Sequence, residues 1–346
     1  MLPLPTGLLA LPSPGDGTVR RLRRKVRLLA ARELLLGSED PSLRAELQRR
    51  LEADSARALD AVGSLDVLPA LLAARSGALS RDAALAVAGP NLRRALGLPT
   101  ESDSVPELAA LPGSPVQLAL ADSNPLADRE AHPDKTGNAW SLGGHPLSEW
   151  QDALGAALAL LDEHLPEWTS ELPVSLERLL PVGYEPELHL SASYREAPGL
   201  AYLTLHPNVV TLAEAIVHET QHGKLMLLTW LDPVLRNGNT TWTRSPVRPD
   251  LRPLMGVLLA VHAFVPVAAL HARLAAADHP SSRTPHFAKR RRDVLAGNQN
   301  GLQTVHELGE ATTSGSRVIA ALQELHEVTM REAPGLTIER GALPPG

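Results

Sequence analysis

Residues 253–270, PLMGVLLAVHAFVPVAAL, are apolar on nearly every side of a helix. A helix without a polar face needs burial on all sides, so this segment predicts a helix at the centre of a helical core. Its one strongly polar residue is His262. Pro266, four residues later, has no backbone N–H for the His262 carbonyl, so we expect a kink or a turn of freed backbone there.

The rest of the chain also favours helices over strands. Residues 18–98 repeat apolar positions at three- and four-residue spacing, and one predicted helix runs from a Thr18 cap to Gly37. The chain has 30 prolines and only 3% aromatic residues, which indicates short helices separated by loops that contain proline. Two extended runs, 187–194 and 200–206, are joined by REAPG and therefore predict a hairpin.

A His-Glu-x-x-His motif lies in the predicted helix at 211–230, which has a capping box at Thr211 and Glu214 and ends before Pro233. The motif occupies His218–His222. Residues four apart share one face of a helix, so its two histidines can bind the same ion. Two solvated or core histidines are the alternative. The chain has no cysteine, so His, Asp and Glu are its possible metal ligands.

A third ligand has to come from elsewhere in the fold. We favour His262, because it is the one strongly polar residue of a buried helix. A buried histidine bonded to a backbone carbonyl is the alternative for this residue. Other candidates for the third ligand are Glu219, His206, His306 and Glu307.

The segments around the motif resemble a known family. Residues 189–227, HLSASYREAPGLAYLTLHPNVVTLAEAIVHETQHGKLML, and 245–268, SPVRPDLRPLMGVLLAVHAFVPVA, are similar to the HExxH-type peptide modification proteins. These are 2-oxoglutarate-dependent peptide β-hydroxylases that act on ribosomally synthesised precursor peptides. The resemblance implies a non-haem Fe(II) bound by the two motif histidines and a further residue, with 2-oxoglutarate and O2 as co-substrates. An imidazole and carboxylate ligand set with open positions suits that chemistry.

Binding of 2-oxoglutarate requires a cation for its distal carboxylate, because a buried carboxylate without a partner is costly. Arginine is the preferred residue, since its guanidinium can donate two parallel hydrogen bonds. We expect Arg252, at the start of the apolar helix, to have this role, with Arg248 and Arg244 as alternatives. Ser191 and Ser193 are expected to line the same pocket.

We therefore expect an Fe(II)- and 2-oxoglutarate-dependent hydroxylase of a side-chain β-carbon in a ribosomally synthesised peptide, with Glu219 in a catalytic role. One alternative is a zinc-dependent metallopeptidase, in which Glu219 would be the general base. The sequence after His222, GKLMLLTWLDP, excludes the metzincin continuation of the motif, whereas a zincin with a later Glu ligand stays open. A non-enzymatic peptide-binding protein is the other alternative.

The expected surroundings of the protein follow from its charge and hydropathy. A net charge of −6 gives no overall basic field, so nucleic acid is not an expected partner. The N-terminal segment lacks the features of a signal peptide, and no apolar run approaches the ~20 residues of a membrane span, so we expect a cytoplasmic protein without a membrane partner.

The expected organisation is α+β and mainly helical, with an N-terminal helical bundle and a helix-rich metal-binding unit that contains a small antiparallel sheet. We expect a helical N-terminal region at 1–100, a loop or linker at 101–147 and a metal-binding catalytic region at 148–335. Two basic runs are expected to be solvated helix faces, although the first could hold an acidic peptide or a phosphate backbone. The runs are Arg20, Arg21, Arg23, Arg24, Lys25 and Arg27, and 289–293.

Overall fold

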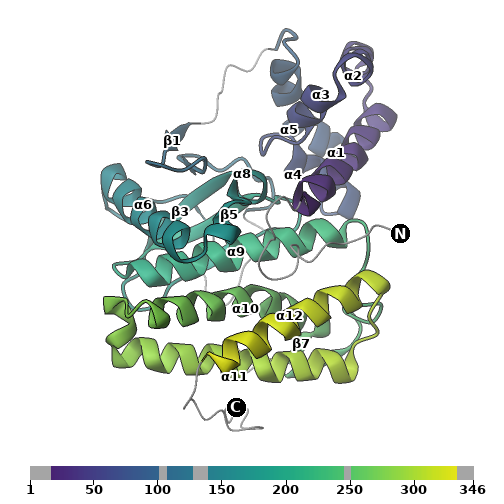
Figure 1. Ribbon diagram of the computed structural model, residues 1–346. Coiled ribbons are helices and arrows are strands. Elements are labelled where there is room, and N and C mark those ends of the chain that lie inside the picture. The colour runs from purple at the N-terminus through teal and green to yellow at the C-terminus, as the bar shows by residue number, and fades with distance from the viewer. Residues whose placement is uncertain (1–16, 101–106, 128–138, 245–250, 333–346) are drawn as a thin grey trace. The chain divides into compact units, whose positions relative to one another are not determined.

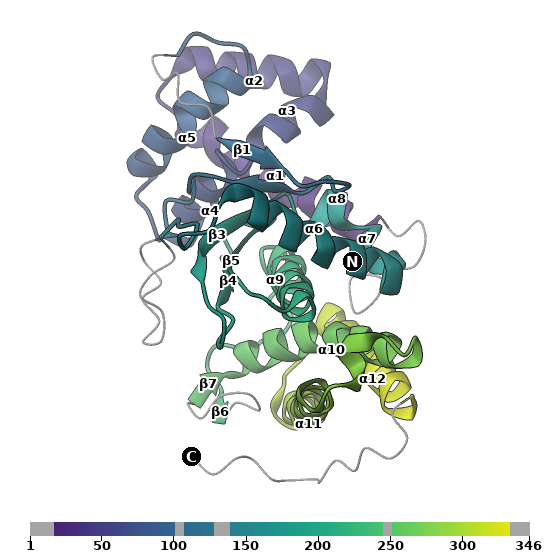
Figure 2. The ribbon, with the colours of Figure 1, turned by 90° about the vertical axis from the view of Figure 1, so that its left-hand side faces the viewer.

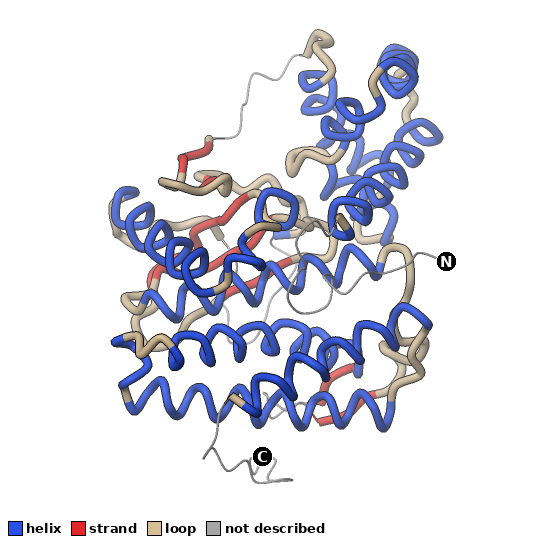
Figure 3. The backbone as a smooth tube through the Cα atoms, in the orientation of Figure 1, coloured by secondary structure: helices blue, strands red, loops and turns tan. Residues whose placement is uncertain are grey.

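The computed structural model describes residues 17–100, 107–127, 139–244 and 251–332. Helices dominate it and strands form two small sheets (Figure 3), which confirms the mainly helical α+β class. The helices are α1 (Thr18–Gly37), α2 (Pro41–Ala53), α3 (Ser55–Val62), α4 (Leu68–Ser76), α5 (Arg81–Ala95), α6 (Leu147–His164), α7 (Pro166–Thr169), α8 (Leu172–Ser175), α9 (Val209–Thr229), α10 (Leu254–Ala276), η3 (Pro280–Arg283), α11 (Pro285–Leu308) and α12 (Thr313–Arg331). The strands are β1 (Leu108–Ala110), β2 (Gln117–Ala119), β3 (Arg178–Tyr184), β4 (Ser191–Ser193), β5 (Leu200–Leu205), β6 (Trp242–Arg244) and β7 (Leu251–Pro253).

The chain forms two compact units, each built from separated segments. We call residues 19–155 with 173–207 the sheet unit, and residues 1–18, 156–172 and 208–346 the helical unit. The boundaries expected at residues 100 and 147 therefore both fall inside the sheet unit rather than between units.

The five-stranded sheet has the order β1-β2-β3-β5-β4 and is mixed, not antiparallel as expected. The β4–β5 hairpin is confirmed, with Ser193 opposite Ala201 in an antiparallel pair. However, β3 pairs in parallel with both β2 and β5. All residues of β5 are buried, as in a central strand that is covered on both faces. The sequence predicted the hairpin because β4 and β5 are close along the chain. It did not predict the parallel pairs, because β2, β3 and β5 are farther apart along the chain.

The segment expected to be a loop, 101–147, contributes two strands to this sheet. β1 and β2 form an antiparallel pair, and Ser141 adds a parallel bridge to Val182 of β3. Strands of three residues are too short to show an alternating pattern, which explains why the sequence did not indicate them.

The sheet unit also contains the N-terminal helices α1 to α5 (Figure 2), and two arginines connect these helices to β3 and to residues beside it. Arg178 of β3 donates two hydrogen bonds to the Asp66 carboxylate, at 2.7 and 2.9 Å. Arg23 of α1 pairs with Glu177 and donates to the Val174 carbonyl at 3.0 Å. Arg23 is buried, so this residue of the basic run is not on a solvated face.

The helical unit is built around α10, which packs against α9, α11 and α12 (Figure 1). By length and composition α10 could cross a membrane, contrary to expectation, since His262 and Pro266 interrupt its apolar run only briefly. However, 78% of its most apolar window is buried inside the fold. Such burial fits the core helix of a soluble protein and confirms the central position expected for it.

Candidate metal centre

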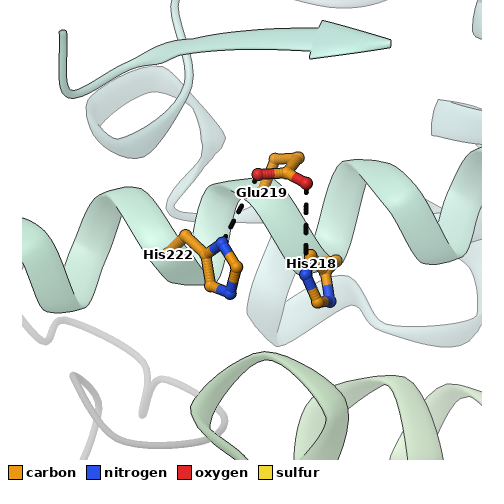
Figure 4. A group of neighbouring side chains, drawn as sticks. All are labelled: His218, Glu219 and His222. Atoms are coloured by element: carbon orange, nitrogen blue, oxygen red, sulfur yellow. Dashed lines mark ion pairs between the residues drawn. The ribbon is translucent and has the colours of Figure 1, made fainter. Parts of the chain in front are cut away.

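The motif helix α9 brings together a group of possible metal ligands. Its members are His218, Glu219 and His222, whose ligand atoms all lie within 4.8 Å of one another. No other such group of three occurs among the residues that the structure describes. Figure 4 shows the two imidazole rings on the same side of α9, as their four-residue spacing predicts, and dashed lines join each ring to the Glu219 carboxylate.

The distances within this group suit a single ion. The Glu219 carboxylate oxygens lie 4.0 Å from Nε2 of His218 and 3.5 Å from Nδ1 of His222. Two atoms bound to one ion at about 2.1 Å can be no more than about 4.2 Å apart, so both Glu219 distances are within this limit, whereas the 4.8 Å span of the whole group requires a small movement of the side chains. Nε2, the other ring nitrogen of His222, is buried and forms no hydrogen bond with any described residue, so it too is available to a metal. The group therefore fits the two-histidine, one-carboxylate donor set.

The His218 ring is in a form that can bind metal. Burial, followed by the neighbouring charge of His222, lowers the pKa of His218 to about 3, so this ring is neutral at neutral pH. The side chains of His218 and His222 remain 20% and 19% exposed, whereas Glu219 is buried. Phe264 of α10 covers part of His218, with ring centroids 4.6 Å apart. The centre is therefore reachable from solvent but has an apolar wall.

The N-terminus of α9 differs from the expected capping box. Asn208 is the N-cap, and its Oδ1 accepts a hydrogen bond from the Val210 N–H at 2.9 Å. Thr211 and Glu214 are instead the third and sixth residues of the helix. The first turn begins earlier because Asn208 is itself a favoured cap, and this leaves Glu214 available for a different role.

Glu214 lies on the same face of α9 as the two histidines, one turn before His218, and joins three helices. Its Oε1 accepts a hydrogen bond from Nε2 of His271 on α10 at 2.7 Å. Its Oε2 accepts one from Nε of Arg290 on α11 at 2.8 Å. The guanidinium of Arg290 also lies 5.4 Å from the centre of the Phe264 ring that covers His218. This network was not predicted from the sequence, where its signal was limited to a second histidine in the apolar helix.

The backbone carbonyl freed by Pro266 is satisfied by the motif helix itself. α10 continues through Pro266, so the proline does not end the helix, and the carbonyl that it frees is that of His262. Gln221, the fourth residue of the motif, donates from Nε2 to the His262 carbonyl at 3.4 Å. Its Oε1 accepts a hydrogen bond from Nε1 of Trp168 at 3.2 Å, and all three residues are buried. The Gln221 amide thus replaces the helical N–H that proline lacks and joins α9 to α10.

Replacement of Gln221 by leucine is expected to destabilise the protein by about 1–3 kcal/mol, because it leaves the Trp168 N–H and the His262 carbonyl without these partners in the interior. Pro266→Ala restores a backbone N–H four residues after His262. In that background the cost of Gln221→Leu is expected to fall by about 1 kcal/mol. Chemical unfolding of the two single variants and the double variant measures this difference. Strict additivity would show that the Gln221 amide does not replace the missing bond.

The other predicted site residues do not join the group. His262 is fully buried on α10, and its role as third ligand stays a prediction. His306 and Glu307 are exposed on α11. Ser191, Ser193 and His206 belong to the sheet unit.

Two of the three predicted arginines lie on the strands before α10. Arg244 is exposed on β6, and Arg252 is half-buried on β7, where it faces Thr243 across the pair. Arg248 lies outside the described residues. The role of Arg252 as a carboxylate anchor therefore stays a prediction.

The chain matches no known protein-family model and no curated protein.

Proposed function

We propose that this protein hydroxylates a side-chain β-carbon in a ribosomally synthesised peptide and depends on Fe(II), 2-oxoglutarate and O2. The observation that carries the proposal is the convergence of His218, Glu219 and His222 on α9. Two imidazoles and one carboxylate with open coordination positions are the donor set of non-haem Fe(II) oxygenases. The resemblance of the segments around the motif to peptide β-hydroxylases supplies the reaction and the substrate class.

Within this proposal, each residue has a definite task. His218 and His222 hold Fe(II) as neutral imidazoles, and Glu219 is the nearest third donor, with His262 as the alternative ligand. Bound Fe(II), together with 2-oxoglutarate and O2, supplies the oxidising power to replace a C–H bond by C–OH. Arg252 pairs with the distal carboxylate of 2-oxoglutarate. The Phe264 ring beside His218 excludes water from one side of the centre.

The partner and compartment follow from the same proposal. The substrate is a precursor peptide, which is first available where ribosomes make it, so we place the reaction in the cytoplasm. Burial of α10, the described helix that could otherwise cross a membrane, supports this placement.

A zinc-dependent peptidase is the second candidate, and one observation favours it. The Glu219 carboxylate is buried beside both histidines, where it could take a proton from a metal-bound water. The two functions differ in their products. A peptidase divides the peptide and needs neither O2 nor a keto acid, whereas a hydroxylase leaves the chain intact.

Anaerobically prepared protein, loaded with Fe(II) and mixed with 2-oxoglutarate and any short peptide that is encoded beside its gene, is expected to act only after O2 is admitted. The peptide should gain the mass of one oxygen atom while succinate and CO2 form, because the co-substrate is oxidised together with the C–H bond. Mass spectrometry with labelled O2 should find the label in the peptide, and labelled water should not supply it. Anaerobic cleavage of the peptide with zinc, at a rate that depends on Glu219, would instead establish the peptidase.

A further inference from the structure

Helix α1, purple in Figure 1, has an exposed face that is almost entirely basic. We call it the α1 basic face and define it by five basic residues and two leucines, namely Arg20, Arg21, Arg24, Lys25 and Arg32 with Leu28 and Leu36. The two leucines are 47% and 67% exposed. At ~100° per residue, all seven fall within about 160° of the helix circumference, so they form one continuous surface.

Four of the five charges on this face are not compensated within the described part of the chain. Arg20, Arg24, Lys25 and Arg32 form no ion pair or side-chain hydrogen bond with any described residue. On other sides of the same helix, by contrast, Arg23 pairs with Glu177 and Arg27 with Asp60. Carboxylates therefore pair with Arg23 and Arg27, whereas the four outer cations named above are left to solvent.

The basic residues of this face destabilise α1. The first turn of the helix contains Arg20 and Arg21 and no acidic residue, and the last turn contains no basic residue, so neither end has the charge that the helix dipole favours. The pair Arg20 and Arg24 places like charges four residues apart, where they repel each other. Leu28 and Leu36 add exposed apolar area to the same side. A binding role explains why a helix would retain charges that weaken it.

We propose that the α1 basic face binds an acidic peptide segment with interspersed apolar residues. The carboxylates of such a peptide complement the unpaired cations, and its apolar side chains cover Leu28 and Leu36. The protein has a net charge of −6, so this local positive surface determines where an acidic peptide can approach. The proposal concerns the sheet unit alone and does not depend on the reaction at the metal centre.

Two other anionic partners fit the face less well. Nucleic acid would leave the leucines without a partner, and the face offers no aromatic ring for base stacking. A membrane-surface helix needs an apolar side that is free to enter the bilayer. In α1 that side, which includes Leu22, Val26 and Leu34, is buried inside the protein.

The test uses the full chain and a fluorescent peptide of Glu and Leu, with Leu at every third or fourth position. A helical peptide of about 16 residues spans the ~24 Å from Arg20 to Leu36 at ~1.5 Å per residue. Reversal of three charges by Arg20→Glu, Arg24→Glu and Lys25→Glu is expected to weaken binding by at least about tenfold. Leu28→Gln with Leu36→Gln is expected to weaken it by about threefold or more, without altering charge.

A matched control reverses three exposed arginines elsewhere, with Arg44→Glu, Arg57→Glu and Arg292→Glu. This variant has the same net charge as the first and is expected to bind the peptide within about twofold of the natural chain, because distant surface charges are screened. Thermal unfolding shows whether a variant binds less because it has lost peptide contacts or because its fold is damaged. Reversal of charge at the start of α1 should raise Tm by about 1–4 °C, since it relieves the conflict with the helix dipole.

The proposal is overturned by no binding of the Glu and Leu peptide, by equal weakening in the two triple variants, or by a fall in Tm for the α1 variant. Tighter binding of a DNA oligonucleotide or of phosphatidylserine vesicles would assign the face to nucleic acid or to a membrane instead. If the triple variant does not fold, the paired leucine variant still decides the matter, because only an amphipathic peptide depends on Leu28 and Leu36.

Discussion

Alanine at His218 or at His222 is expected to lower the affinity for Fe(II) by at least about 100-fold, because loss of a ligand exceeds the 10- to 100-fold effect of removing a group that merely orients one. The natural chain should bind one ion, held by the group on α9. Anaerobic competition with a chromogenic chelator measures both the stoichiometry and the affinity. Unchanged iron binding in both variants would show that the motif is two core histidines rather than a metal centre.

The matched control is His306→Ala, which removes an exposed histidine of α11 outside the group. Its iron affinity should equal that of the natural chain. The same measurement identifies the third ligand. Full iron occupancy in His262→Ala together with loss in Glu219→Ala would assign that position to Glu219, and the opposite result would assign it to His262.

The features that the sequence predicted are those set by neighbouring residues. α1 has the predicted bounds, from Thr18 to Gly37, because apolar spacing and a terminal glycine are local signals. The β4–β5 hairpin was found for the same reason. The motif histidines share one side of α9 because their spacing requires it.

The features that the sequence did not predict depend on partners far along the chain. The residues of β3 and β5 do not indicate that these two strands pair with each other in parallel. In the sequence, Gln221 is one polar residue of the motif among others. Its role depends on the fold, which brings it to the His262 carbonyl that Pro266 leaves without a helical N–H. Glu214 was misassigned to a capping box, since a glutamate after a threonine gives that signal whether or not the helix begins there.

The Glu214 network links three helices of the helical unit beside the metal centre. His271 is fully buried, and its Nε2 must donate to Glu214, because an ionised carboxylate only accepts hydrogen bonds. Burial raises the pKa of Glu214, but the charges and hydrogen bonds of His271 and Arg290 outweigh burial and lower it to about 2. The ionised carboxylate is therefore more stable in the folded chain than in the unfolded chain.

Replacement of Glu214 by glutamine is expected to destabilise the protein by about 2–3 kcal/mol at pH 7, since it leaves Arg290 and His271 without the charge that they share. Arg290 is 40% exposed, so solvent screening reduces the loss below that of a fully buried pair. The stabilisation should be complete above the unfolded pKa of about 4.5 and lost as the pH falls towards about 2. Guanidinium unfolding of the natural chain and the variant between pH 2 and 7 measures this difference.

The matched control, Glu167→Gln, breaks the more exposed pair with Arg273 and should cost no more than about 1 kcal/mol. An equal loss in both variants, or a Glu214→Gln effect that does not shrink in acid, would show that the stability of the three helices does not depend on the charge of Glu214.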